Sequence, residues 1–345
     1  MLGNPDHRNW GSEVSNFCLA VPHAIGFREI PMNNTTMESI EAAITKRKPL
    51  LNITNALRLV NGLGDDLPGL VLEQYDDRCV LHLFDKRWIA EKEALTTFVC
   101  DRLNAQYLII KERLDSKALN AAQINASVRI DHAPAQTVVV ENGLRFGVDL
   151  NDGLNSGLFL DMRHNRKLVA GLTRGETVLN CFAYTCSFGV YARAAGAASV
   201  VNVDISRKSL ARGHENYRLN RLDSDKTEFV RADALGFMKR ALRRENRFGC
   251  IILDPPSFSR HEGKTFSVKN DLGPLVGVAM NILKSGGVLL VSTNYSGLSH
   301  QALEEAVRNA GKKEVKSIKR LGQDADFCGS GRMPESYLAA VLVKT

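Results

Sequence analysis

From residue 178 onwards, short apolar runs rich in Val, Ile and Leu alternate with longer segments of helical spacing. The runs typical of strands cover residues 178–181, 199–204, 227–231, 250–254, 287–293 and 337–343. The segments typical of helices cover residues 189–195, 207–219, 234–244, 268–283 and 300–310. Strands and helices that alternate in this way bury their apolar faces against one another in an α/β fold. The pattern therefore predicts an open, mostly parallel sheet within a domain of residues 151–345.

The first 150 residues follow a different pattern. Strand-like runs surround a single helical segment, and they cover residues 56–62, 70–75, 79–84 and 107–111. The dipeptide Asn142-Gly143, which favours tight turns, lies between two apolar runs and predicts a hairpin. We therefore expect a small α+β domain over residues 46–150. Residues 1–45 are polar with little periodicity, and we expect an N-terminal arm there with a short helix near residues 38–44.

Charge is distributed unevenly along the chain. Residues 1–150 carry 16 Lys and Arg against 19 Asp and Glu, which gives −3, whereas residues 151–345 carry 29 against 19, which gives +10. A basic half of this kind suggests a polyanionic partner, and nucleic acid is the usual one. The alternative is a mildly basic protein that binds nothing acidic.

The composition also indicates where the protein works. The seven cysteines have irregular spacing and form neither a CxxC pair nor a Cys/His cluster, so we expect free thiols and no metal site. No uninterrupted apolar run approaches the 18 or so residues of a membrane span. The first residues lack a basic segment followed by an apolar one, which argues against export. We expect a cytoplasmic protein, and a homodimer is compatible with the sequence.

Polar and acidic residues follow the expected strands, at the sheet edge where ligands bind in such folds. The loop that follows residue 181 contains neither GxGxxG nor GxxxxGK[ST], which argues against a dinucleotide or a nucleoside triphosphate. Asp204 ends the second strand, 24 positions after Asn180, where an acid can accept hydrogen bonds from a ribose diol. Asp233 and Asp254 follow the next two strands. A ribose-binding acid without a diphosphate loop points to a nucleoside cofactor without pyrophosphate, and S-adenosylmethionine fits.

Each of these signals has a simpler reading. An Asp after a strand often caps the following helix, and the pair Pro255-Pro256 is often a rigid turn. The occurrence of such features in order, on consecutive strand–helix units, favours the cofactor site.

Four segments together resemble class I S-adenosylmethionine-dependent methyltransferases: residues 156–163 (SGLFLDMR), 179–185 (LNCFAYT), 202–206 (NVDIS) and 253–258 (LDPPSF). The resemblance spans about residues 55–345. Within that class, the segments most resemble the 23S ribosomal RNA methyltransferases. This group includes cytosine-5 enzymes with a PUA domain and the guanine-N7 half of a bifunctional enzyme. The resemblance implies a Rossmann-like sheet, S-adenosylmethionine as cofactor and ribosomal or other structured RNA as partner. No PUA domain is recognisable in this chain, so RNA docking would rest on residues 46–150 and the basic half.

The resemblance also implies roles for individual residues. The methionine and adenosine side of the cofactor would be lined by Asn180, Phe182, Ala183, Tyr184 and Thr185. The ribose would be held by Asp204 with Ser206 beside it, and the adenine by Asp233. The linker side of the pocket would be closed by Phe159, Asp161 and Arg163. The catalytic segment would lie between the methyl group and the target base, and it consists of Asp254, Pro255, Pro256, Ser257 and Phe258. Asp254 would also contact the cofactor.

Two departures from the family pattern affect the chemistry. Cys186 stands where the family commonly has glycine, and a side chain there would crowd the cofactor or require a changed loop. Tyr295 stands where the cytosine-5 enzymes carry a Cys before Ser-Gly-Leu. Cytosine C5 needs a thiolate that adds at C6, whereas guanine N7 carries a free lone pair and needs only in-line placement. We therefore favour guanine N7 as the methylated atom.

Three alternatives remain open from the sequence. The first is a cytosine-5 enzyme with an unconventional cysteine, for which Cys328 is a candidate. The second is a methyltransferase for small molecules or proteins on the same scaffold. The third is an RNA-binding protein whose cofactor site has decayed.

Overall fold

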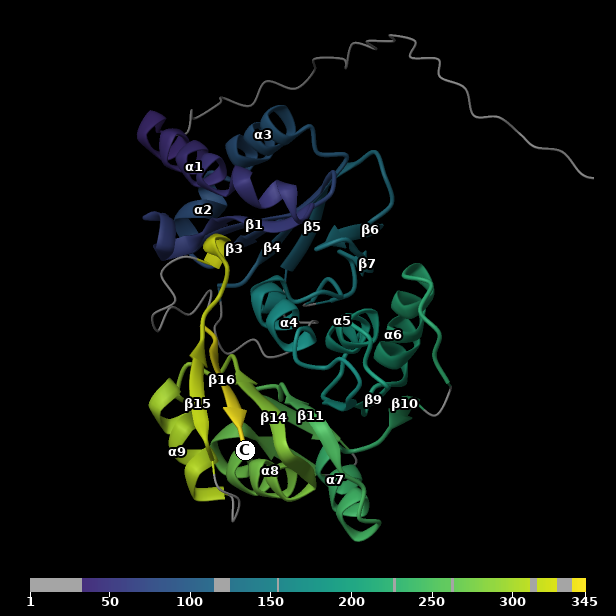
Figure 1. Ribbon diagram of the computed structural model, residues 1–345. Coiled ribbons are helices and arrows are strands. Elements are labelled where there is room, and N and C mark those ends of the chain that lie inside the picture. Colours follow the sequence, from purple (N-terminus) through teal and green to yellow (C-terminus); the bar gives the residue numbers. More distant parts are fainter. Residues whose placement is uncertain are drawn as a thin grey trace, which may run out of the picture. The chain divides into compact units, whose positions relative to one another are not determined.

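The computed structural model describes residues 33–114, 125–153, 155–225, 228–261, 264–310, 315–327 and 337–345, apart from the side chains of residues 259–265. These residues belong to one unit, Met32–Thr345. They form two larger sheets, each with helices packed against it (Figure 1). No helix within these ranges has the length and apolar character needed to cross a membrane.

The larger sheet is built from residues after position 176. Its strands are β8 (Thr177–Cys181), β9 (Ser199–Asp204), β10 (Phe229–Arg231), β11 (Phe248–Leu253), β14 (Leu283–Thr293), β15 (Ser317–Leu321) and β16 (Ala339–Lys344). They lie in the order β10-β9-β8-β11-β14-β16-β15. All pairs from β10 to β14 are parallel, whereas β16 runs antiparallel to both β14 and β15. The prediction of an open, mostly parallel sheet is confirmed.

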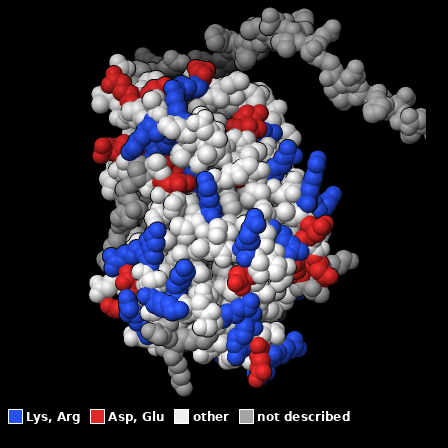
Figure 2. Space-filling view, viewed as in Figure 1, with Lys and Arg blue, Asp and Glu red and all other residues white. Residues whose placement is uncertain are grey.

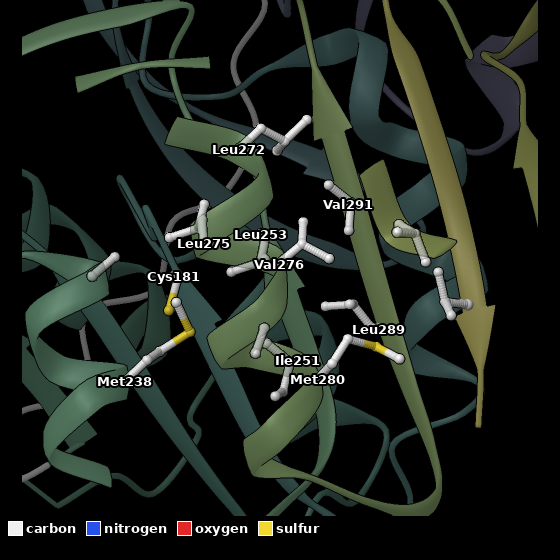
Figure 3. Packing of buried hydrophobic residues seen from close by; sticks show 14 of the residues in the cluster. Cys181, Met238, Ile251, Leu253, Leu272, Leu275, Val276, Met280, Leu289 and Val291 are labelled. Atoms are coloured by element: carbon white, nitrogen blue, oxygen red, sulfur yellow. The ribbon is translucent and has the colours of Figure 1, made fainter. Parts of the chain in front are cut away.

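Helices cover both faces of this sheet. They are α4 (Arg163–Ala170), α5 (Ser187–Ala194), α6 (Arg207–Leu219), α7 (Ala234–Arg243), α8 (Val268–Ile282) and α9 (His300–Ala310). On one face, α7, α8 and α9 pack against alternate strand residues such as Leu179; on the other, α4 and α5 pack against Val178. Met238 of α7 points toward Cys181 of β8, and Val276 of α8 lies beside Leu253 of β11 in this core (Figure 3). Since helices lie on both sides, β11 is buried throughout and reads as a continuous apolar run.

The smaller sheet lies earlier in the chain. Its strands, in order, are β1 (Ala56–Asn61), β2 (Leu70–Tyr75), β3 (Arg78–Leu83), β4 (Tyr107–Glu112) and β5 (Asn125–Asp131). One face packs against α1 (Asn34–Arg47), α2 (Lys86–Ala90) and α3 (Lys92–Leu103). The 3-10 helices η1 (Lys48–Asn52) and η2 (Gly62–Asp65) flank β1. The expected hairpin of β2 and β3 is present and antiparallel.

Shorter elements lie outside the two larger sheets. β6 (Gln136–Glu141) and β7 (Leu144–Asp149) form the second expected hairpin, in which Asn142 and Gly143 both have positive φ. A further hairpin consists of β12 (Phe258–His261) and β13 (Lys264–Ser267). The 3-10 helices η4 (Leu160–Met162) and η6 (Ala325–Phe327) lie in the segments that border the site described below.

Several elements differ from the sequence expectation. The helix expected near residues 38–44 extends over Asn34–Arg47, because Asn33 caps its start and Ile40 and Ile44 pack on the smaller sheet. β5 and β15 are edge strands that we did not expect from the sequence, and their side chains are mostly exposed. In β5, Ala126, Val128 and Ile130 alternate with polar residues, whereas β15 shows no such alternation.

Candidate active site

The carboxyl ends of β8, β9, β10 and β11 meet at one edge of the larger sheet. Cys181 of β8 pairs with Val203 of β9 and with Leu253 of β11, and Arg231 of β10 pairs with Asp204 of β9. The loops that follow these strands therefore start at nearly the same level. They carry most of the residues that the sequence suggested for a cofactor site.

The loop after β8 has an unusual backbone. Phe182, Tyr184 and Cys186 have φ values of 57°, 47° and 59°, in the left-handed region that side chains other than glycine rarely adopt. Each such residue costs about 1 kcal/mol or more and persists only where its surroundings fix it. Ala183 N donates to Val203 O at 3.0 Å, which ties the middle of the loop to β9.

Cys186 occupies one of these left-handed positions, which explains why glycine suits it. Its side chain is buried, and its Sγ lies against Gly213 on α6. The thiol therefore points beneath the loop into the protein, and burial raises its pKa well above the ordinary value. The Cys186 side chain has room at this position because the facing helix α6 carries a glycine, Gly213.

Asp204 links the first two loops at the sheet edge. Its Oδ2 accepts a hydrogen bond from Tyr184 N and its Oδ1 accepts one from Ser206 N, both at 2.8 Å. Burial raises the pKa of Asp204, and these backbone donors oppose the shift. Ile205 N also donates to this carboxylate, so of its roughly four acceptor sites at least one remains for a hydroxyl of a ribose.

Asn180 and Thr185 are buried and hold the loop from below. Asn180 Nδ2 donates to Asn202 Oδ1 at 2.9 Å, and Asn202 Nδ2 donates to Tyr217 OH at 3.1 Å. Thr185 Oγ1 donates to the backbone carbonyl of Gly157 at 2.6 Å. Sequence reasoning missed Asn202, although a polar residue inside an apolar strand was a signal for it.

Asp233 and Ser206 both cap helices. Asp233 Oδ2 accepts from Gly236 N at 2.7 Å at the start of α7, and Ser206 Oγ accepts from Ser209 N at 3.1 Å at the start of α6. The simpler reading of an Asp after a strand therefore applies to Asp233. Asp233 is also exposed at this edge of the sheet.

Asp254 has the most perturbed carboxyl group at this edge. Burial raises its pKa to about 6, and the nearby Asp161 adds to the shift, while Ser292 Oγ, which donates to Asp254 Oδ1 at 2.6 Å, opposes it. Ser257 Oγ donates to Asn294 Oδ1 at 2.7 Å and so joins the end of β11 to the end of β14. A carboxyl group of this kind exchanges a proton near neutral pH.

The rest of the segment after β11 runs outward from this carboxyl group. Pro255 is buried and Pro256 is exposed. Phe258 is 44% exposed, which is unusual for a large apolar side chain and compatible with stacking on a base.

The linker before α4 borders the same edge. The Phe159 ring lies 5.4 Å from the Tyr184 ring, centroid to centroid. Burial raises the pKa of Asp161, and its Oδ1 has no hydrogen-bond partner among the described residues. Phe159, Asp161 and Asn294 all line a cavity of about 240 Å³ that extends toward the smaller sheet.

Arg163 lies in the interior and is not part of that lining. Its Nη2 and Nη1 pair with the carboxylate of Asp326 at 3.0 and 3.1 Å, and its Nη2 also donates to Ala56 O at 2.8 Å. Glu141 lies 3.6 Å from its Nε. The geometry places Arg163 where it fixes the linker and η6 against β1.

These residues fit S-adenosylmethionine. Asp204 offers an acceptor for a ribose hydroxyl, and Asp161 Oδ1 is a buried acceptor still open to a ligand. The loop after β8 has no glycine-rich diphosphate cradle. The cofactor would lie across the ends of β8 and β9, where it would supply an electrophilic methyl group.

Comparison with known proteins agrees with this fit. The family described as S-adenosylmethionine-dependent methyltransferase matches residues 121–344. Ribosomal RNA large subunit methyltransferase I of Shewanella frigidimarina is 32% identical over 294 residues, covering 83% of this chain and 73% of its own. YwbD of Bacillus subtilis, assigned as a ribosomal RNA large subunit methyltransferase, is 32% identical over 298 residues, covering 84% and 75%.

A solved structure is similar over a comparable length. SMU.776, assigned as a methyltransferase and complexed with SAH, superimposes with a TM-score of 0.81 at 28% identity, covering 92% of this chain and 83% of its own. Its bound SAH is the demethylated form of the cofactor that the strand-end residues fit. The chain belongs to the S-adenosylmethionine-dependent methyltransferase family, and S-adenosylmethionine is its cofactor.

Proposed function

We propose that this enzyme methylates a base of large-subunit ribosomal RNA, and that the methylated atom is N7 of a guanine. The Shewanella and Bacillus relatives are both named as ribosomal RNA large subunit methyltransferases, which supports ribosomal RNA as substrate. The similarity extends over 73% and 75% of their lengths, so it includes most of each relative. The choice of atom rests on the residues at the strand-end edge.

The cysteines argue against cytosine C5. Cys79, Cys181, Cys186 and Cys250 are buried, and burial raises the pKa of each thiol, so none of them is a ready nucleophile. Cys100 lies on α3, against the core of the smaller sheet. The two remaining cysteines, at positions 18 and 328, lie outside the described residues.

The acceptors at the edge suit guanine. Its Watson–Crick edge presents two neighbouring donors, N1–H and the 2-amino group, while N7 lies on the opposite side of the base. Asp161 raises the pKa of Asp254, so the two carboxyl groups lie near each other, and Asp161 also lines the cavity beside the strand-end edge. A carboxylate that accepts from the donor edge would turn N7 toward the methyl group, and such orientation supplies much of the rate. The buried acceptor Asp161 Oδ1, which lies near Asp254, is the observation that carries the proposal.

The charge distribution supports an RNA partner. Residues 151–345 carry a net charge of +10, and Lys and Arg side chains are spread over much of the face in Figure 2. Phosphate contacts by spread cations give sequence-independent affinity that falls steeply with salt. The smaller sheet and its helices would dock the RNA beside the strand-end edge.

Nucleoside mass spectrometry tests the proposal. The purified enzyme is incubated with unmodified ribosomal RNA and S-adenosylmethionine carrying a labelled methyl group, and the RNA is digested. We expect label in 7-methylguanosine, and none when Asp204→Ala replaces the wild type. Label in 5-methylcytidine, together with a covalent complex on 5-fluorocytosine RNA, would instead identify a cytosine-5 enzyme.

A further inference from the structure

The cavity beside Asp161 has more room than a transferred methyl group alone would occupy. Its volume of about 240 Å³ is comparable to that of a nucleotide. One wall is the linker and the end of β14, with Asp161 and Asn294. The other wall is the smaller sheet, so the cavity joins the methyl-transfer edge to that sheet.

The sheet wall consists of one face of β1 to β4. Glu73 on β2, His82 on β3 and Lys111 on β4 point to this face, since side chains alternate between the two faces of a strand. The intervening residues, such as Leu72 and Leu81, pack under the helices on the other face. Polar and charged groups therefore gather on the face that does not contribute to that core.

Glu73 is the centre of this group. Arg58 Nη2 pairs with Glu73 Oε1 at 2.7 Å, and Tyr75 OH donates to Glu73 Oε2 at 3.0 Å. Burial alone would raise the pKa of Glu73, but Arg58 and His82 hold it well below the ordinary value. The carboxylate stays charged and fixes the groups around it.

His82 offers a second acceptor that is open to a ligand. Its Nε2 lies 3.4 Å from Glu73 Oε2, and its Nδ1 is buried with no hydrogen-bond partner in the described ranges. The ring is 7% exposed, and burial with the nearby Arg113 lowers its pKa to about 4, so it is neutral. With Nε2–H directed at Glu73, Nδ1 is an acceptor, as Asp161 Oδ1 is across the cavity.

Cations and aromatic rings complete the lining. Lys111 and Arg113 contribute positive charge, and Lys111 Nζ is anchored on Gly153 O at 2.7 Å. The rings of Phe159 and Phe327 line the same space. Aromatic faces, buried acceptors and cations in one cavity match the base, donor edge and phosphate of a nucleotide.

We propose that this cavity receives the extruded target guanosine, with the donors of its base on His82 Nδ1 and Asp161 Oδ1 and its phosphate toward Lys111 and Arg113. The proposal rests on the proposed function for the identity of the substrate. It assigns part of base recognition to the smaller sheet rather than to the methyltransferase sheet. Extrusion of the base would free its donor edge for these acceptors and bring N7 to the methyl donor within the cavity.

Titration of the enzyme with GMP, in the presence of saturating S-adenosylhomocysteine, tests the pocket without catalysis. We expect GMP to bind more tightly than CMP, and inosine monophosphate, which lacks the 2-amino donor, to bind about tenfold more weakly than GMP. Lys111→Met should weaken all the nucleotides by a similar factor because it acts on the phosphate. His82→Gln should reduce the preference for GMP over CMP.

A matched control is Lys86→Met, which removes an exposed cation on α2 outside the cavity and should leave each affinity unchanged. Thermal unfolding of each variant monitors folding. If GMP and CMP bind equally, or if Lys111→Met has no effect in a folded protein, the pocket assignment is wrong even when ribosomal RNA is methylated. If GMP binds as expected but no labelled nucleoside forms in ribosomal RNA, the pocket stands and the proposed substrate is wrong.

Discussion

The side chain of Cys186 fills the space beside Gly213: a Cβ added at Gly213 would lie 2.9 Å from the Cβ of Cys186 and still closer to its Sγ. The loop after β8 and helix α6 are therefore packed around one sulfur atom. The fit depends on a thiol side chain at position 186 and on the absence of any side chain at position 213.

Gly213→Ala should destabilise the protein by about 1–3 kcal/mol, the usual cost of overpacking a core. It should also weaken binding of S-adenosylhomocysteine, because Cys186 could move only by shifting the loop that carries Tyr184. The double variant Cys186→Gly with Gly213→Ala should recover most of the stability. Urea unfolding and calorimetric titration measure both effects, and equal losses in the single and double variants would contradict the coupling.

Asp204→Asn should lower the affinity for S-adenosylhomocysteine by about tenfold to a hundredfold, since it removes a charged acceptor for the ribose. Calorimetric titration measures the change. Asp101→Asn, at an exposed position on α3, is the matched control and should bind as the wild type does. Unchanged affinity in Asp204→Asn would place the ribose elsewhere.

Asp254 makes stability depend on pH. Its pKa is raised from 3.8 to about 6 in the folded protein, so folding favours the protonated form. That contribution is complete below pH 3.8 and is lost as the pH rises through about 6, a change of about 3 kcal/mol at most. Between pH 4.5 and 7, the free energy of unfolding of the wild type should fall relative to that of Asp254→Asn. Parallel pH profiles for the two proteins would show that Asp254 is not perturbed.

Arg163→Met should destabilise the protein by about 3–5 kcal/mol, because it leaves the buried carboxylate of Asp326 without its guanidinium partner. Arg218→Met is the control, since its pair with Glu215 is exposed and contributes little. Chemical denaturation measures both free energies. A loss below 1 kcal/mol in Arg163→Met would mean that the linker is held by other contacts.

The larger sheet could be predicted from the sequence because each of its central strands is a mainly apolar run followed by a helix. Helix α6 matches the expected bounds, since its pattern has strong periodicity and Ser206 caps its start. The edge strand β15 could not be found, because its sequence has no apolar alternation. The strand β5 does have one, in Ala126, Val128 and Ile130, and its prediction was missed.

The candidate site could be predicted only as residues along the chain. Asp204 and Asp254 were found because they follow strands, where parallel topology brings side chains together. The polar face of the smaller sheet was missed, since Glu73 and His82 lie within runs that read as ordinary apolar strands. Their importance depends on the cavity they face, which forms only when the linker and β14 come against the sheet.

The position of β16 sets an order for biosynthesis. β15 is made before β16, yet β16 separates β15 from β14 in the sheet. Until residues 339–344 leave the ribosome, β14 has an open edge and β15 has no partner strand. An open edge of this kind readily pairs with other chains. Newly made protein should therefore depend on chaperones most during the interval between synthesis of these two strands.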